Sequence, residues 1–323
     1  MNLHPAPYSK DYDITDAMFG VFRTPGGMPF FWKLFGFGTL LFAIIGVLTV
    51  RPILSSYVDL IRASFLLESD PDVALQALAT IGHFFFVMML FTVGYAAVAA
   101  VIRSAFFRGY FFGDLGGSIP FKVGRDEVRQ WLSYLGFYVI VTLTLTLALI
   151  ALMVPFMILM FITGGDSMGV MVLGIVVVYT FSFAAFIWIG VRLSTAGALT
   201  ALRGKTHLLA ARYVTKNRFW PLLGSILVAG LFGYVLSYIA MTMGLMVAFP
   251  GLEGSDLITI MMGTDQEGTL EALDRASDSA SFNLKSVLAI VLASAGYSFY
   301  VLILAGPQAF FTQQWAEAGG ERD

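Results

Sequence analysis

Residues 131–162 read WLSYLGFYVIVTLTLTLALIALMVPFMILMFI, 32 positions without a charged side chain. A membrane-spanning helix needs about 20 mostly apolar residues, so this stretch is long enough to cross a bilayer. It exceeds one crossing, but two spans and a polar turn do not fit into it. The stretch therefore predicts one tilted or bent spanning helix. Pro155 is the expected kink, because proline lacks an N–H and clashes with the preceding turn.

Five other stretches pass the same test. With the first, the predicted spans cover residues 34–50, 81–102, 131–162, 168–191, 220–249 and 287–305. Hydrophobic residues make up 58% of the 323 residues and charged residues 12%, whereas soluble domains have about 45–50% and about 25%. A soluble domain of this length could not bury that apolar surplus. The predicted fold class is therefore an all-α, polytopic six-helix transmembrane bundle.

The basic residues orient this bundle. One side of the bundle carries 15 Lys and Arg residues, and the opposite side carries four. The basic side holds the N-terminal segment, the second and fourth loops and the C-terminus. Lys and Arg are enriched in cytoplasmic loops. Both termini are therefore predicted to be cytoplasmic, with an N-terminal segment at 1–30 that contains an amphipathic helix, a membrane domain at 31–315 and a tail at 316–323.

Proline and acidic residues stand at the ends of several apolar runs. The first run stops at Arg51-Pro52, and the sixth ends before Gly306-Pro307. On the opposite, acidic side, Asp70-Pro71 is typical of a helix start. The long loop between the fifth and sixth spans predicts one or two short surface helices.

A faint internal repeat accompanies the spans. The hexapeptides FWKLFG at 31–36, WLSYLG at 131–136 and FWPLLG at 219–224 each stand at the start of a span. They predict three helical hairpins of parallel topology; chance placement of an aromatic belt is the alternative. Indole rings lie well at the headgroup level of a bilayer. The predicted interfacial anchors are Trp32, Trp131 and Trp220.

Basic amphipathic segments precede the hairpins. Apolar residues at helical spacing around Ile14 and around Leu208 alternate with charged residues, which is typical of a helix that lies on an anionic inner leaflet. An ordinary basic loop is the alternative. Lipids are therefore the predicted partners. The candidate lipid-headgroup contacts are Arg103, Arg129, Arg192, Lys205, Arg212, Lys216 and Arg218.

No catalytic, cofactor or metal site is predicted. The chain has no cysteine and three scattered histidines, and it lacks an HExxH pair, a phosphate-binding glycine loop and a GxSxG motif. No basic stripe indicates nucleic acid. His83 is expected to be a hydrogen-bonded structural residue. The pair Asp126-Glu127 lies between Arg125 and Arg129, so solvated charge balance is the expected explanation.

The polar residues inside the spans are neutral. Hydroxyl groups such as those of Thr144 and Ser182 are expected to bond neighbouring helices. Glycines and small residues, among them Gly233 and Gly296, predict close helix packing or an oligomer interface.

Residues 192–224 read RLSTAGALTALRGKTHLLAARYVTKNRFWPLLG. The stretch contains, in order, the end of a span, small residues, a basic helix and a tryptophan at the start of the next span. It resembles the six-helix membrane domain attached to some bacterial glycerophosphodiester phosphodiesterases. It also resembles related stand-alone bacterial membrane proteins of unknown function. The resemblance covers these 33 residues and, more loosely, the six-span layout. It implies a bundle in the bacterial inner membrane. It implies no activity, since the chemistry of that family belongs to a separate soluble barrel.

Three functions are consistent with these patterns. A non-enzymatic scaffold or accessory factor that binds lipid, a partner membrane protein or a second copy of itself agrees best with the chemically inert spans. The alternative is a transporter or channel, which would have a mid-membrane cavity lined by Thr142, Thr146, Tyr179 or Tyr238. A membrane-embedded enzyme would need carboxylates gathered around His83.

Overall fold

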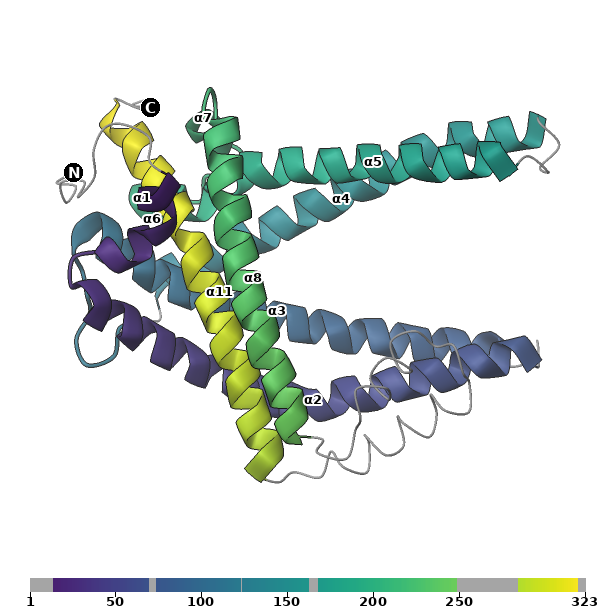
Figure 1. The fold of residues 1–323 in the computed structure, drawn as a ribbon, viewed down its shortest axis with the longest axis horizontal. Coiled ribbons are helices and arrows are strands. Elements are labelled where there is room, and N and C mark those ends of the chain that lie inside the picture. The colour runs from purple at the N-terminus through teal and green to yellow at the C-terminus, as the bar shows by residue number, and fades with distance from the viewer. Residues whose placement is uncertain (1–13, 70–73, 123, 163–167, 249–283, 319–323) are drawn as a thin grey trace. The chain divides into compact units, whose positions relative to one another are not determined.

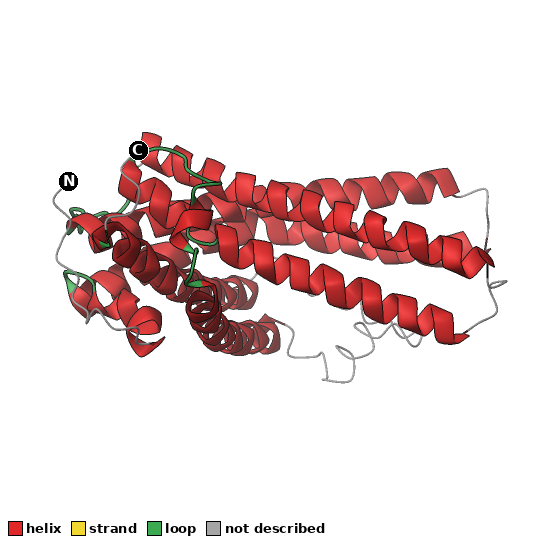
Figure 2. Ribbon diagram, turned by 90° about the horizontal axis from the view of Figure 1, so that it is seen from above, coloured by secondary structure: helices red, strands yellow, loops and turns green. Residues whose placement is uncertain are grey.

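The computed structural model describes residues 14–69, 74–122, 124–162, 168–248 and 284–318, and in these ranges it contains helices and no strand (Figures 1 and 2). The elements are α1 (Ile14–Phe19), a 3-10 turn η1 (Gly20–Arg23), α2 (Gly27–Ser69), α3 (Ala74–Phe112), α4 (Arg125–Ile162), α5 (Met168–Leu193), α6 (Ala196–Arg203), α7 (Ala211–Val214), α8 (Phe219–Ala248) and α11 (Leu284–Glu317).

Six of the helices described are long and apolar enough to cross a membrane: α2, α3, α4, α5, α8 and α11. Each overlaps one of the six predicted spans, so the all-α, six-helix fold class is confirmed. The physical reason is the lipid solvent. Backbone N–H and C=O groups find no water in the hydrocarbon region, so every apolar run must satisfy them within its own helix.

Two helices continue past the prolines that follow the predicted apolar runs. Pro52 lies inside α2, which continues to Ser69, and Pro307 lies inside α11, which continues to Glu317. Proline removes one backbone donor, whereas a break would expose several polar groups, and spanning helices tolerate proline for this reason. Pro155 lies within α4 in the same way. The features predicted at Asp70-Pro71 and in the loop at 249–283 lie outside the described residues.

The chain divides into two compact units. One contains residues 1–26, 103–228 and 305–323, and the other contains residues 27–102 and 229–304. Helices α4, α5, α6 and α7 belong entirely to the first unit, whereas α3, α8 and α11 contribute residues to both.

The first unit has a buried apolar cluster that includes the N-terminal helix. Ala17 of α1 is fully buried together with Val191, Leu222, Phe310 and Phe311. Asp16 next to it is also buried. The amphipathic helix predicted in this N-terminal segment is thus a six-residue helix whose inner face packs on protein.

The second unit shows the close helix packing that its small residues predict. A Cβ built on Gly296 of α11 would lie 2.8 Å from the Cα atom of Ser237 in α8. A Cβ on Gly244 of α8 would lie 2.8 Å from the carbonyl oxygen of Ala289 in α11. The backbones of the two helices therefore approach closely because neither position carries a side chain.

Threonine hydroxyls in four of the long helices donate to their own backbone. Thr49, Thr92, Thr144 and Thr242 each donate to the carbonyl oxygen four residues earlier, at 2.7, 2.8, 2.8 and 2.9 Å. For Thr144 this replaces the predicted bond to a neighbouring helix. Such a bond satisfies the hydroxyl locally, so these polar residues do not by themselves indicate a polar pathway.

Candidate functional site: a cationic cavity

A cavity of about 540 Å³ opens among α4, α5 and the α7 segment of the first unit. We call it the cationic cavity, and its lining residues are Ile140, Thr144, Trp188, Ile189, Arg192, Leu193, Leu209, Arg212, Tyr213 and Lys216. Its volume falls in the range of about 300–1,000 Å³ that is typical of small-molecule sites. Five of its residues are apolar, and three carry a positive charge.

Helix α6 positions the α7 segment against this cavity. Six of its eight residues are buried, so it is an internal helix of the protein. The hydroxyl groups of Ser133 in α4 and Thr200 in α6 lie 2.9 Å apart, and the backbone N–H of His207 donates to the same Thr200 hydroxyl at 3.4 Å. Gly204 ends α6 with a φ of 64°, a left-handed conformation that glycine adopts without strain.

The sequence predicts a longer basic amphipathic helix in this segment than the structure contains. After Gly204 the chain forms turns and the four-residue helix α7. Ala211 and Val214 are buried, whereas Arg212 and Lys216 are exposed. The predicted continuous amphipathic helix is therefore replaced by turns and one short helix, in which Ala211 and Val214 point inward and Arg212 and Lys216 point outward.

Arg192, in the last turn of α5, is the most enclosed cation of the cavity. Its guanidinium donates to the hydroxyl of Thr215 at 3.4 Å and lies 5.8 Å from the ring centre of Trp188 and 5.7 Å from that of Phe219. Aromatic faces attract a cation and hold a guanidinium in place. Among the described residues no carboxylate pairs with Arg192, so its charge remains available to a ligand.

The α7 segment supplies the other two cations. Arg212 donates to the hydroxyl of Tyr213 at 3.0 Å and lies 4.9 Å from the centre of that ring. Lys216 is exposed. Burial, followed by the charges of Arg203 and Lys205, lowers the pKa of His207 below its ordinary value. The positive charge of this segment at neutral pH therefore comes from Arg and Lys side chains.

Apolar side chains form a second part of the lining of the cationic cavity. Ile140 comes from α4, Ile189 and Leu193 come from the end of α5, and Leu209 precedes α7. Cations beside an apolar wall can bind a molecule that has an anionic group at one end and a hydrocarbon at the other. Arginine is suited to such a site because its planar fork can donate two hydrogen bonds to a phosphate or carboxylate.

Three of the seven predicted headgroup contacts meet in this cavity: Arg192, Arg212 and Lys216. The other four lie elsewhere. Lys205 is exposed outside the lining. Arg103 lies 4.8 Å from the ring centre of Tyr134, Arg129 pairs with Asp126 at 3.1 Å, and Arg218 donates to Gln314 at 3.4 Å.

The predicted interfacial anchors differ in exposure. Trp32 and Trp220 are exposed, the latter at 76%, whereas Trp131 is half-buried. An exposed indole is available to the headgroup region, so the geometry of Trp32 and Trp220 is compatible with anchoring. It does not test the anchoring itself, which stays a prediction.

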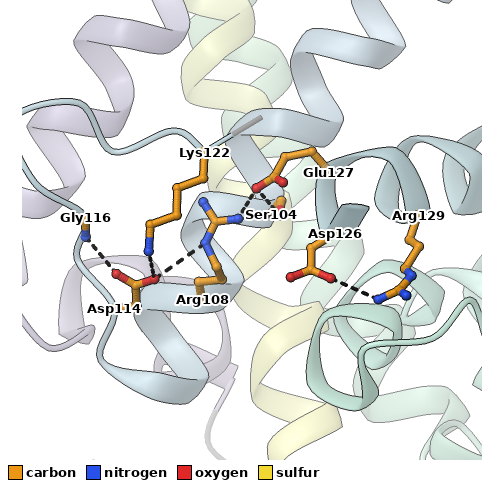
Figure 3. A network of polar contacts seen from close by, with 8 residues as sticks. All are labelled: Ser104, Arg108, Asp114, Gly116, Lys122, Asp126, Glu127 and Arg129. Carbon is orange, nitrogen blue, oxygen red and sulfur yellow. Dashed lines mark hydrogen bonds and ion pairs between the residues drawn. The ribbon is translucent and has the colours of Figure 1, made fainter. Parts of the chain in front are cut away.

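A second group of basic residues lies where α3 ends and α4 begins (Figure 3). We call it the ion-pair network. Arg108 forms an ion pair with Glu127, which also accepts a hydrogen bond from Ser104 at 3.2 Å. Asp114 accepts from Lys122 at 2.6 Å and lies 3.9 Å from Arg108. Every cation of this network has a carboxylate partner.

Glu127 corrects the expectation of a solvated carboxylate pair. Asp126 is exposed and balances Arg129, as expected, but Glu127 is only 5% exposed and is held by Arg108. The reason is helical geometry, since adjacent residues of α4 point to different sides of the helix. Sequence adjacency therefore did not indicate a shared environment.

The hydrogen bond from Lys122 is the main cause that lowers the pKa of Asp114 below its ordinary value; the backbone N–H of Gly116 and the charge of Arg108 act in the same direction, against partial burial. Ion pairs of Asp114 with Lys122 and Arg108 thus stabilise the loop between α3 and α4.

Sequence reasoning missed the apolar half of the cationic cavity, because Ile140, Ile189 and Leu209 look like ordinary apolar residues. One signal could have located the site. The sequence contains no Asp or Glu between Asp166 and Glu253, so the six basic residues of this stretch have no acidic neighbour in the sequence.

The residues expected to line a transport pathway do not line the cationic cavity. Tyr179 is 72% exposed, and Tyr238, Thr142 and Thr146 are also exposed. They lie on outward surfaces of the long helices. His83, which would mark an embedded enzyme, is exposed on α3. The described ranges hold no group of three or more His, Cys, Asp or Glu side chains placed to bind a metal ion.

No protein-family model matches the sequence, and no curated protein or solved structure matches it either. The class of protein rests on the six long apolar helices, which make the chain a multi-pass membrane protein.

Proposed function

We propose that this chain is a non-enzymatic membrane protein, of the scaffold or accessory type, that binds an anionic lipid in the cationic cavity. The observation that supports the proposal is that Arg192, Arg212 and Lys216 line one cavity together with apolar side chains. In a chain whose six long helices can span a membrane, the abundant molecule that combines an anionic group with a hydrocarbon is a lipid. The bound lipid would couple this protein to its membrane or to a partner protein.

The proposal also concerns location. The resemblance to bacterial membrane domains and the excess of Lys and Arg on one side support the bacterial inner membrane, with both termini in the cytoplasm. The cationic cavity, whose three cations belong to the end of α5 and the basic fourth loop, would then take its lipid from the inner leaflet. A periplasm-active reporter fused after Asp323 is expected to be silent, and strong activity would reverse this orientation.

Lipid binding is tested on the full chain purified in mild detergent. Native mass spectrometry would compare dioctanoyl phosphatidylglycerol with dioctanoyl phosphatidylcholine, which has the same tails but no net charge. We expect the anionic lipid to bind more tightly. Arg192→Gln is expected to weaken that binding by about tenfold or more, because a charge-assisted hydrogen bond contributes about 1.5–3 kcal/mol.

Matched variants separate the cavity from general surface charge. Lys216→Gln removes an exposed cation of the lining, so it should weaken binding without disturbing the fold. Lys205→Gln removes an exposed cation of the same segment outside the lining and should leave binding within about twofold. Equal losses for Lys216→Gln and Lys205→Gln, or equal binding of the two lipids, would contradict the proposal.

A further inference from the structure

The cationic cavity differs from an ordinary basic surface in its excess charge. Three cations line it, and no carboxylate does. In the ion-pair network, by contrast, Arg108, Lys122 and Arg129 each lie against a carboxylate. The cavity therefore presents three positive charges that only a bound anion, or mobile counterions, can balance.

Lipid phosphates differ in the charge that they bring. A phosphodiester headgroup such as phosphatidylmethanol carries one negative charge on its phosphate. A phosphomonoester carries between one and two, because its second proton dissociates with a pKa of about 6, and it presents three acceptor oxygens instead of two. Three cations in the lining of one cavity match the dianionic form better than the monoanionic one.

The positions of the cations support the same assignment. Arg192 is fixed at the end of α5 by Thr215 and two aromatic rings, so its guanidinium is pre-organised. Arg212 and Lys216 approach from α7 and the turn after it. Donors that come from two separate elements can contact different oxygens of one terminal phosphate, whereas a second ester substituent would occupy one of those oxygens.

We propose that the cationic cavity binds a phosphomonoester lipid, that is, a phosphate with a single ester bond to a hydrophobic backbone, in preference to phosphodiester lipids. The phosphate lies among Arg192, Arg212 and Lys216, and a hydrocarbon chain lies along Ile140, Ile189 and Leu193. This inference rests on the proposed function, because it names the ligand of the same site.

The test compares three probes on the full chain in mild detergent. Dioctanoyl phosphatidic acid is the phosphomonoester lipid, dioctanoyl phosphatidylmethanol is the smallest phosphodiester with the same tails, and inorganic phosphate has the headgroup chemistry without a tail. Dissociation constants are measured at pH 5.0 and pH 7.5 for the natural sequence, Arg192→Gln, Lys216→Gln and the control Lys205→Gln.

We expect phosphatidic acid to bind about tenfold more tightly than phosphatidylmethanol at pH 7.5. Its affinity should fall at pH 5.0, where the second proton is restored, whereas that of the diester should stay constant. Arg192→Gln and Lys216→Gln should reduce the preference for the monoester, and Lys205→Gln should keep it.

The possible failures are distinct. Equal and pH-independent affinities for the two lipids would overturn the monoester assignment and leave anionic-lipid binding intact. Inorganic phosphate that binds as tightly as phosphatidic acid would overturn the lipid assignment in favour of a free anion. Absence of binding by all three probes would overturn the proposed function itself.

Discussion

The ion-pair network and the cationic cavity both contain Arg and Lys side chains, but these residues have different partners in the two regions. In the network Arg108 faces Glu127, and Lys122 faces Asp114. In the cavity Arg192 faces a hydroxyl and two aromatic rings. Both regions belong to the same compact unit. The difference teaches that the role of a basic residue depends on its partner. A cation that is paired with a carboxylate stabilises the fold, whereas a cation without such a partner is available to a ligand.

Breaking the network should cause the largest effect. Glu127→Ala leaves the guanidinium of Arg108, which is only 14% exposed, without its nearest carboxylate. Loss of one partner from a buried pair costs about 3 kcal/mol or more. The free energy of unfolding, or the unfolding temperature in detergent, should fall accordingly, whereas lipid binding to the folded fraction should persist.

Asp126→Ala is the matched control, because it removes the neighbouring carboxylate from an exposed pair with Arg129. Exposed pairs contribute about 0–1 kcal/mol. If both variants lose the same stability, Glu127 has no special structural role and the contrast between the two regions fails.

A change in α6 should have an intermediate effect, because this helix packs on α4 and positions the α7 segment. A Cβ on Gly197 would overlap the side-chain nitrogen of Gln130 and lie 3.0 Å from the hydroxyl of Tyr134. Gln130 is buried, so its side chain has little room to move aside, and overpacking of this kind costs about 1–3 kcal/mol. Gly197→Ala should therefore lower the unfolding temperature and also weaken lipid binding.

Gly190→Ala serves as the control, since a Cβ at that position of α5 meets nothing within 4 Å. It should be neutral or slightly stabilising, because alanine is the better helix former. Full lipid affinity in the Gly197→Ala variant would show that α6 does not position the cavity.

Adding a carboxylate to the cavity would make it resemble the network. Leu209 lines the cavity and is exposed, so Leu209→Glu introduces a negative charge among the cations without opening the core. We expect affinity for phosphatidic acid to fall by about tenfold, which is about 1.4 kcal/mol, with little change in unfolding temperature. Thr206→Glu adds the same charge at an exposed position outside the lining. A comparable loss of affinity in this variant would show that long-range electrostatics, and not the cavity, causes the effect.

The smallest expected effect is a response of the network to acid. Because its folded-state pKa is lowered, Asp114 contributes stability that is fully present above the unfolded value of about 3.9 and is lost as the pH falls through the folded-state value. Its carboxylate accepts the backbone N–H of Gly116 at 3.2 Å. Hydrogen-exchange protection of that amide, corrected for intrinsic rate, should therefore decrease in acid, and Asp114→Asn should abolish this pH dependence.

The six helices could be predicted from the sequence because the backbone polar groups of a long apolar run in lipid must be hydrogen-bonded within a helix. The apolar runs alone do not show how far the helices extend, because α2 and α11 continue past Pro52 and Pro307 into more polar residues.

The site was predicted only in part. The basic residues of the fourth loop were identified as anion contacts, and Arg192, Arg212 and Lys216 do line one cavity. The cavity depends on how α4, α5 and α7 pack, which no local pattern encodes. The burial of Glu127 was missed for the same reason, because its partner Arg108 lies 19 residues earlier in the sequence, on another helix.

The threonines that bond their own helices bear on how the protein is made. A span that emerges from the ribosome enters the bilayer before the later spans exist, so its polar groups must be satisfied without neighbours. Thr49 and Thr92 in the first two spans meet this requirement with carbonyl oxygens of their own helices. These two hydroxyls therefore need no neighbouring helix when their spans enter the bilayer.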